Sequence, residues 1–204
     1  MRRGLHLGAL TALMCCVACV GLLHVLRPDL PPVAHRLSEY ATGPYGWVMT
    51  LAFVALGVGL VALGAALRPV GRAGPLAWVL PVAALVGGVG AALSAAFRAG
   101  APDGGDVVHS WASLLLALGV LVVAGRSLPA LAPERRTLAD PAGAGLVSAG
   151  AVLLLVSTVL HDSTVSGLAQ RLLWGVLVGA LLRQAWHGAT GRAMADGVPS
   201  PDLS

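Results

Sequence analysis

The chain has no lysine and few charged residues of any kind. Charged side chains make up 11% of its 204 residues, and all 13 basic residues are arginine. In a soluble domain roughly a quarter of the residues are charged, and these cover its surface. This chain has too few, so we expect lipid to cover much of its surface. The sequence also lacks a glycine-rich phosphate loop and a basic stripe with interleaved aromatics. We therefore expect the lipid bilayer as a partner, and no nucleic acid.

Cysteine is scarce as well, and its three copies lie in one apolar run. Cys16 and Cys19 have CxxC spacing, but no second pair completes a zinc site. We interpret them, with Cys15, as small apolar residues of a membrane helix. Met1-Arg2-Arg3 before this run resembles a signal peptide. The run continues to Leu26 without a cleavage-like site, which predicts a retained first helix.

Six apolar segments approach or exceed the roughly 20 residues that cross a hydrocarbon core. They cover residues 5–26, 45–67, 75–96, 107–125, 143–161 and 165–186. No strand-like alternation appears, and the connections are polar or rich in glycine and proline. The sequence predicts an all-α polytopic membrane protein, with a six-helix transmembrane bundle over residues 1–188 and a disordered tail over 189–204. Small residues recur along these segments and predict close helix packing.

The arginines are distributed unevenly between the two sides of this topology. Nine fall on one side: Arg2, Arg3, Arg68, Arg72, Arg126, Arg135, Arg136, Arg183 and Arg192. The other side has four: Arg27, Arg36, Arg98 and Arg171. Because basic loops stay in the cytoplasm, we expect a multi-pass protein of the cell membrane with cytoplasmic N- and C-termini.

Residues capable of chemistry gather on the opposite, non-cytoplasmic side. Three histidines lie at helix ends: His24, His109 and His161. The carboxylates there are Asp103, Asp106, Asp162 and Glu39. Three neutral imidazoles with carboxylates would suit zinc and an open position for water, although no HxxxH or HExxH spacing occurs. Acid–base catalysis by a His–Asp pair is a second interpretation, and histidines hydrogen-bonded to loops are a third.

Arg171 lies about six residues inside the last helix, roughly 9 Å below the outer boundary. A charge at such a depth costs roughly 2.5–3.5 kcal/mol, less what snorkelling recovers. We expect it to point into the bundle and pair with Asp162, Asp103 or Glu39. Binding an anionic headgroup is the alternative role of its guanidinium. The predicted ligand-binding set is Arg171, Glu39, Asp162, Tyr40 and Gln170.

The stretch from residue 24 to residue 47 is the only long polar connection near the N-terminus. Pro28, Pro31 and Pro32 block a helix and favour an extended path. Two interpretations remain open for this loop: a lid over the outer mouth of the bundle, or a stiff connector.

Several short patterns in and around this loop carry a resemblance. They are H-x-x-x-P at His24 and Pro28, Ser38-Glu39-Tyr40, Tyr45-Gly46-Trp47-Val48-Met49 and Gly167-Leu168-Ala169-Gln170-Arg171. Over about residues 24–186 the chain resembles the prokaryotic integral membrane proteins catalogued as domain of unknown function 998. It departs at 97–103, where the family commonly has a Phe-Pro-x-Asp-like segment. The resemblance implies a six-helix membrane protein and no established activity.

Two classes of function remain open from the sequence. In the first, the outer site binds a lipid or small amphiphile, or a membrane partner. In the second, a small intramembrane enzyme acts on a lipid or isoprenoid, with catalytic candidates His24, His109, His161, Asp103 and Asp106. A secondary transporter is less favoured, because the second to fifth segments lack central ionisable residues. No cofactor other than zinc is indicated, and the sequence does not define an oligomeric state.

Overall fold

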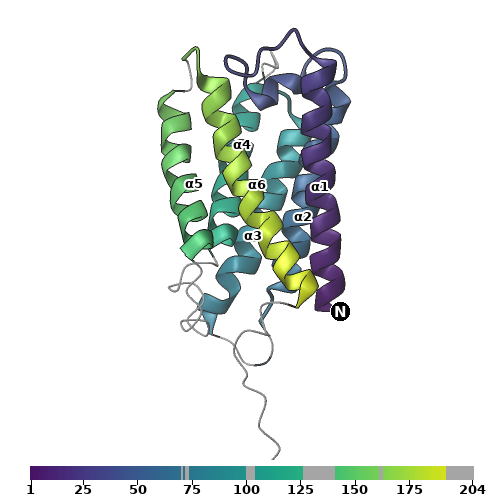
Figure 1. The fold of residues 1–204 in the computed structure, drawn as a ribbon, viewed down its shortest axis with the longest axis vertical. Helices are drawn as coiled ribbons and strands as arrows, with labels where there is room; N and C mark the ends of the chain where they lie inside the picture. The colour runs from purple at the N-terminus through teal and green to yellow at the C-terminus, as the bar shows by residue number, and fades with distance from the viewer. Residues whose placement is uncertain (70, 72–73, 100–103, 126–140, 161–162, 192–204) are drawn as a thin grey trace, which may run out of the picture.

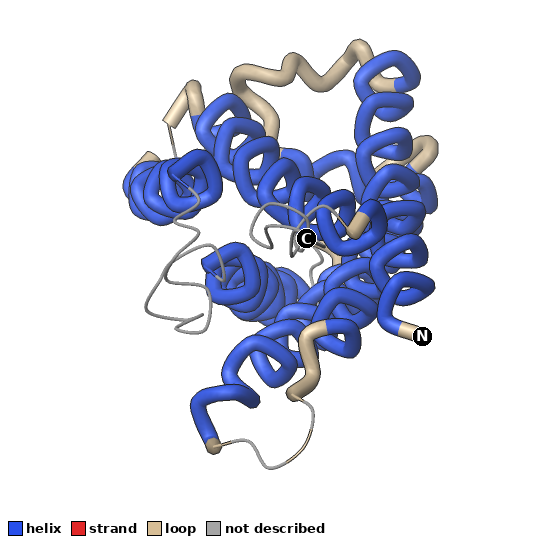
Figure 2. The backbone as a smooth tube through the Cα atoms, turned by 60° about the horizontal axis from the view of Figure 1, so that its bottom comes forward, coloured by secondary structure: helices blue, strands red, loops and turns tan. Residues whose placement is uncertain are grey.

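The computed structural model describes residues 1–69, 71, 74–99, 104–125, 141–160 and 163–191. Within these ranges the chain is built of helices and loops, without a strand (Figure 2). The elements are α1 Arg2–Leu26, η1 Leu37–Ala41, α2 Gly46–Ala66, η2 Pro75–Trp78, α3 Val79–Ala96, α4 Gly105–Ala124, α5 Pro141–Val159 and α6 Ser166–Thr190. The all-α prediction is confirmed, and each predicted segment corresponds to a helix. The predicted end of the last helix was too early, because α6 continues to Thr190.

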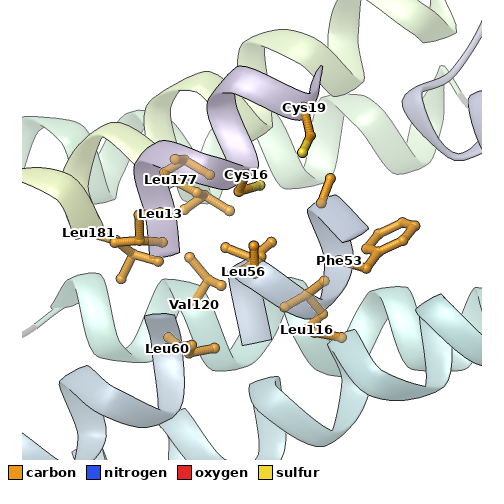
Figure 3. Packing of buried hydrophobic residues seen from close by; sticks show 14 of the residues in the cluster. Leu13, Cys16, Cys19, Phe53, Leu56, Leu60, Leu116, Val120, Leu177 and Leu181 are labelled. Atoms are coloured by element: carbon orange, nitrogen blue, oxygen red, sulfur yellow. The ribbon is translucent and has the colours of Figure 1, made fainter. Parts of the chain in front are cut away.

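The helices alternate in direction and form one bundle. Figure 1 shows the loop between α1 and α2 and the start of α6 at one end. The N-terminus and the end of α6 lie at the other. α1 packs against both α2 and α6, α3 lies against α2 and α4, and α5 packs mainly on α6. The core contains fully buried leucines from several helices (Figure 3): Leu13, Leu60, Leu116, Leu177 and Leu181.

Glycines allow α3 and α4 to approach closely. A Cβ atom added at Gly119 would meet the Gly87 backbone at 2.6 Å. One added at Gly90 would meet the backbone of Leu116 at 2.7 Å. Close backbone contact through small residues is how helices associate where lipid gives no hydrophobic drive. Here the small residues serve the packing that the sequence predicted.

Four helical segments are long and apolar enough to cross a membrane: Arg2–Leu26, Gly46–Ala66, Pro75–Ala96 and Gly105–Ala124. A shorter apolar stretch covers Gly145–Val159. Large apolar side chains are exposed along these helices, among them Leu22, Val58, Val89 and Leu155. A soluble protein rarely exposes so much contiguous apolar surface, whereas a bilayer covers it. The chain is therefore a membrane protein.

Candidate functional site

A cavity of about 520 Å³ lies between α1, α2 and α6. Leu37 and Ser38 of η1 close it at the end where the first loop lies, and α4 adds Ser113 to its wall. Most of the lining is apolar. The polar lining residues are His24, Ser38, Ser113, Gln170 and Arg171. All but Ser113 belong to the loop end of the helices or to η1, so the cavity has an apolar body and a polar end.

Arg171 is the centre of the polar end. Its Nε donates to Nε2 of His24 at 2.9 Å, and its Nη2 donates to the Tyr40 hydroxyl at 3.1 Å. Its Nη1 donates to three backbone carbonyls, of Pro32 at 2.6 Å, His35 at 2.5 Å and Gly167 at 3.1 Å. The guanidinium carbon also lies 5.5 Å from the centre of the Tyr40 ring. The side chain points into the bundle and connects α6 to α1 and to the loop.

The predicted pairing of Arg171 with Glu39 is wrong. The Glu39 carboxylate accepts hydrogen bonds from Nδ1 of His35 at 2.7 Å and from the Arg36 backbone at 3.0 Å. The Arg36 side chain adds a third contact at 3.4 Å. The described partners of Arg171 are instead neutral acceptors, because carbonyls brought by the loop satisfy its donors. The other predicted partners, Asp103 and Asp162, lie outside the described residues.

His24 is fixed as a neutral imidazole by its two hydrogen bonds. Its Nε2 accepts from Arg171, and a guanidinium N–H can only donate, so this nitrogen carries no hydrogen. The hydrogen is therefore on Nδ1, which donates to the carbonyl of Val20 at 2.7 Å. The ring also lies 5.4 Å from the Tyr40 ring. Both nitrogens of His24 are thus used within the protein.

His109 is buried in α4 and is held in a similar way. Its Nδ1 bonds the carbonyl of Phe97 at 2.7 Å, and its Nε2 lies 3.3 Å from the hydroxyl of Ser113. The carbonyl can only accept, so Nδ1 carries the hydrogen and the ring is oriented toward Phe97. The Ser113 hydroxyl lies between Nε2 of His109 and the Ser94 hydroxyl, which is 3.4 Å away. His109 does not itself line the cavity, although Ser113 does. Asp106 precedes it in the first turn of α4 and is exposed.

The two predicted histidines that the structure describes, His24 and His109, are not gathered in a metal site. Of the two that are described, His24 alone lines the cavity, and His161 lies outside the described residues. Among the described parts of the chain, no group of three or more His, Cys, Asp or Glu side chains is placed to hold a metal ion. The zinc interpretation therefore gains no support from the described geometry.

The first loop is docked on the beginning of α6. The Val33 carbonyl accepts from the backbone of Leu168 at 3.0 Å, which satisfies one of the free N–H groups at a helix start. The Ser166 hydroxyl donates to Ala34 at 3.2 Å. Gln170 accepts from the Leu37 backbone at 2.6 Å. The loop thus covers one end of the cavity, and hydrogen bonds hold it there as a connector between α1 and α2.

Tyr40 anchors the loop from within. Its side chain is completely buried, and its hydroxyl donates to the Leu30 carbonyl at 3.0 Å while accepting from Arg171. A buried hydroxyl that both donates and accepts ties the two halves of the loop to α6. Tyr40 and Gln170, both predicted as ligand-binding residues, therefore lie beside Arg171.

Arg27 secures the two ends of the loop and was not singled out from the sequence. Its Nε and Nη2 bind the Asp29 carboxylate at 2.9 Å and 2.8 Å. Its Nη1 donates to the carbonyls of Thr42 at 2.7 Å and Pro44 at 3.2 Å. The hydrogen bonds from Arg27 lower the pKa of the Asp29 carboxyl. The spacing Arg-Pro-Asp at a helix end was the available signal for the ion pair.

The comparison with known families agrees with this picture. Residues 10–187 match the model of a family described as "Protein of unknown function (DUF998)". The chain belongs to the DUF998 family. No curated protein matches it, and no solved structure does. The resemblance noted in the sequence is thereby confirmed, and the family description assigns no activity to this DUF998 protein.

The arrangement in this DUF998 protein suits a ligand with one polar end. Ligand pockets commonly have volumes of roughly 300–1,000 Å³ and are mostly apolar, with a few placed polar groups. The cavity of about 520 Å³ fits that description. The groups at its polar end are a guanidinium, a neutral imidazole, an amide and a hydroxyl. They can donate and accept hydrogen bonds to a headgroup while the apolar walls surround a chain.

Proposed function

We propose that this DUF998 protein binds a lipid or small amphiphile in the cavity between α1, α2 and α6. The apolar chain lies against the walls, and the polar group lies at the end formed by His24 and Arg171. One observation carries the proposal: a cavity of about 520 Å³ has apolar walls and a cluster of polar side chains at a single end. Such a division matches the division within an amphiphile.

In this proposal all six helices span a cell membrane and both termini are cytoplasmic. The arginine asymmetry of the sequence supports this orientation. The antiparallel course of the helices supports termini on the same side, since the N-terminus and the end of α6 lie at one end of the bundle (Figure 1). The polar end of the cavity then lies toward the non-cytoplasmic side, at the depth of the outer leaflet.

Filling the cavity tests the proposal. Gly179 lines it, and a Cβ added there meets nothing within 4 Å, so Gly179→Leu places an isobutyl group in open space. Gly21→Leu is the matched control, because Gly21 also has open space around its Cβ but does not line the cavity. Native mass spectrometry of detergent-purified protein should show a bound amphiphile in the parent and the control. Occupancy in Gly179→Leu should fall, with a Kd about tenfold higher, which corresponds to about 1.4 kcal/mol. Equal occupancy in all three proteins would contradict the proposal.

A second candidate function follows from the contact between Ser113 and His109. The Ser113 hydroxyl lines the cavity and lies 3.3 Å from Nε2 of His109, whose ring the Phe97 carbonyl orients at 2.7 Å. A hydroxyl paired with an oriented base is the arrangement of an activated nucleophile. As an enzyme, the protein would cleave a lipid ester: Ser113 attacks the carbonyl and its proton passes to His109. His109 gives that proton to the departing oxygen, the alcohol leaves, and water then hydrolyses the acyl-serine to the free acid and Ser113. Labelling by a fluorophosphonate in the parent, absent from Ser113→Ala, is the result expected for this alternative; an unlabelled parent excludes it.

A further inference from the structure

We propose that the ligand of this cavity carries an anionic headgroup, a carboxylate or a phosphate, on a single alkyl chain. This inference rests on the proposed binding function and names the ligand class for the same site. The volume of about 520 Å³ lies in the lower half of the usual range for small-ligand pockets. It suits one chain better than the two chains of a bilayer phospholipid.

Charge is the first argument for an anion. Among the described residues that line the cavity, Arg171 is the only arginine, and none of them is acidic. The other titratable groups there do not offset its charge. His24 is neutral because of its two hydrogen bonds. Cys16 is buried, and burial favours the neutral thiol over the charged thiolate. The polar end of the cavity therefore has a positive potential.

The second argument is that the described partners of Arg171 accept hydrogen bonds from it without neutralising its charge. They are backbone carbonyls, a hydroxyl and an imidazole nitrogen. Charged groups removed from water need a counter-charge as well as hydrogen bonds. None of these described partners is a carboxylate, and an anionic headgroup would supply a negative charge beside them.

Further donors surround the position that such a headgroup would take. Nη2 of Arg171 has two N–H groups, and the Tyr40 hydroxyl accepts one of them. Gln170 uses its amide oxygen for the Leu37 backbone, which leaves the NH₂ group as its contribution to the cavity wall. Ser38 adds a hydroxyl. Charge-assisted hydrogen bonds from a guanidinium to a carboxylate or phosphate are stronger than those to a neutral oxygen. The site should therefore distinguish an acid from an alcohol of the same chain length.

Trp174 provides a probe inside the cavity, because it is the only tryptophan among the lining residues. The others are exposed and can be replaced by phenylalanine: Trp47, Trp78, Trp111 and Trp186. The protein that retains only Trp174 would be titrated in detergent with dibrominated 18-carbon probes, whose bromines quench tryptophan fluorescence. Three probes share the chain and differ in the head: the carboxylic acid, the alcohol and the amine. Mildly alkaline buffer keeps the acid ionised.

The acid should bind about tenfold more tightly than the alcohol, and the amine should bind least. In Arg171→Gln the ratio of acid to alcohol should fall toward one. The comparison of the three probes in the protein that keeps Arg171 decides the question even if Arg171→Gln does not fold. Equal quenching by acid and alcohol would overturn the anionic headgroup while leaving the lipid-binding proposal intact. Absence of quenching by every probe, or quenching unchanged by Gly179→Leu, would overturn both.

Discussion

The Nε of Arg171 donates a 2.9 Å hydrogen bond to Nε2 of His24, joining residues 147 positions apart in the chain. The same guanidinium holds the first loop through the carbonyls of Pro32 and His35. One side chain therefore connects the last helix, the first helix and the cover of the cavity. The stability of the loop and the character of the proposed ligand site both depend on it.

Replacing Arg171 by glutamine should lower the melting temperature in detergent. The partly buried carbonyl of His35 and Nε2 of His24 lose their donor, and an acceptor left unsatisfied away from water costs about 1–3 kcal/mol. Because Glu39 is bound by His35 and Arg36 instead, adding Glu39→Gln should not restore the lost stability. Arg68→Gln, on an exposed residue, is the control and should melt like the parent. If the double variant melted at a temperature closer to the parent than Arg171→Gln does, the result would support an ion pair between Arg171 and Glu39.

The chain has two tyrosines, which makes Tyr40→Phe a well-controlled experiment. The Tyr40 hydroxyl is buried and bonds both Leu30 and Arg171, so its removal should destabilise the protein by about 1–3 kcal/mol. Tyr45 is 46% exposed, and Tyr45→Phe should leave the melting temperature nearly unchanged. Thermal unfolding of the two variants side by side measures the difference. Equal melting would show that the buried hydroxyl is not an anchor of the loop.

Gly167→Ala should lift the loop from α6. A Cβ added at Gly167 would overlap the backbone carbonyl of His35 and lie 2.6 Å from that of Pro32, and backbone cannot move aside cheaply. Alanine is intrinsically the better helix former, so a stabilised Gly167→Ala would mean that the loop does not lie against α6. Gly8→Ala, with open space around its Cβ, is the control. Limited proteolysis should cut the 27–45 loop of Gly167→Ala faster than that of the parent or the control.

Acid should release the same loop. Burial raises the pKa of Glu39, but the hydrogen bonds from His35 and Arg36 outweigh it and hold that pKa below its ordinary value of 4.5. A carboxylate with a lowered pKa in the folded protein stabilises it fully above the unfolded pKa, and the contribution is lost as the pH falls through the folded pKa. The pKa of Asp29 is also lowered, by Arg27. Melting temperature should therefore drop below about pH 4.5 more steeply in the parent than in Asp29→Asn/Glu39→Gln. Parallel pH profiles would contradict this.

The helices could be predicted because long apolar runs leave a membrane chain few alternatives. The depth of Arg171 also predicted correctly that its side chain turns into the bundle. The partner could not be predicted, because the argument assumed a carboxylate, whereas tertiary folding brings loop carbonyls to the guanidinium. Arg27 was missed for the same reason, since its contacts with Thr42 and Pro44 cross 15 and 17 residues of chain.

The cavity itself was beyond the reach of the sequence. Small residues predict close packing, and at Gly87 and Gly119 the helices do approach through them. Gly175 and Gly179 of α6 have the same chemistry, yet they line open space beside α1 and α2. Whether a glycine on a helix allows contact or leaves a void depends on the position of the neighbouring helix, and no local pattern contains that information.

Cysteine labelling in intact cells tests the orientation on which the outer-leaflet site depends. After Cys15, Cys16 and Cys19 are replaced by alanine, a single cysteine is introduced by Ala34→Cys in the first loop or by Gly74→Cys between α2 and α3. Both positions are exposed, and a Cβ at Gly74 meets nothing within 4 Å, so neither change should disturb packing. They lie beyond opposite ends of α2, so one spanning helix places them on opposite sides of the membrane. With cytoplasmic termini, an impermeant maleimide should label the cysteine at position 34 and leave the one at position 74 unlabelled until the cells are lysed. The reverse pattern would mean that the protein has the opposite orientation. Arg171 and the polar end of the cavity would then lie at the cytoplasmic leaflet, and the ligand would have to come from that side.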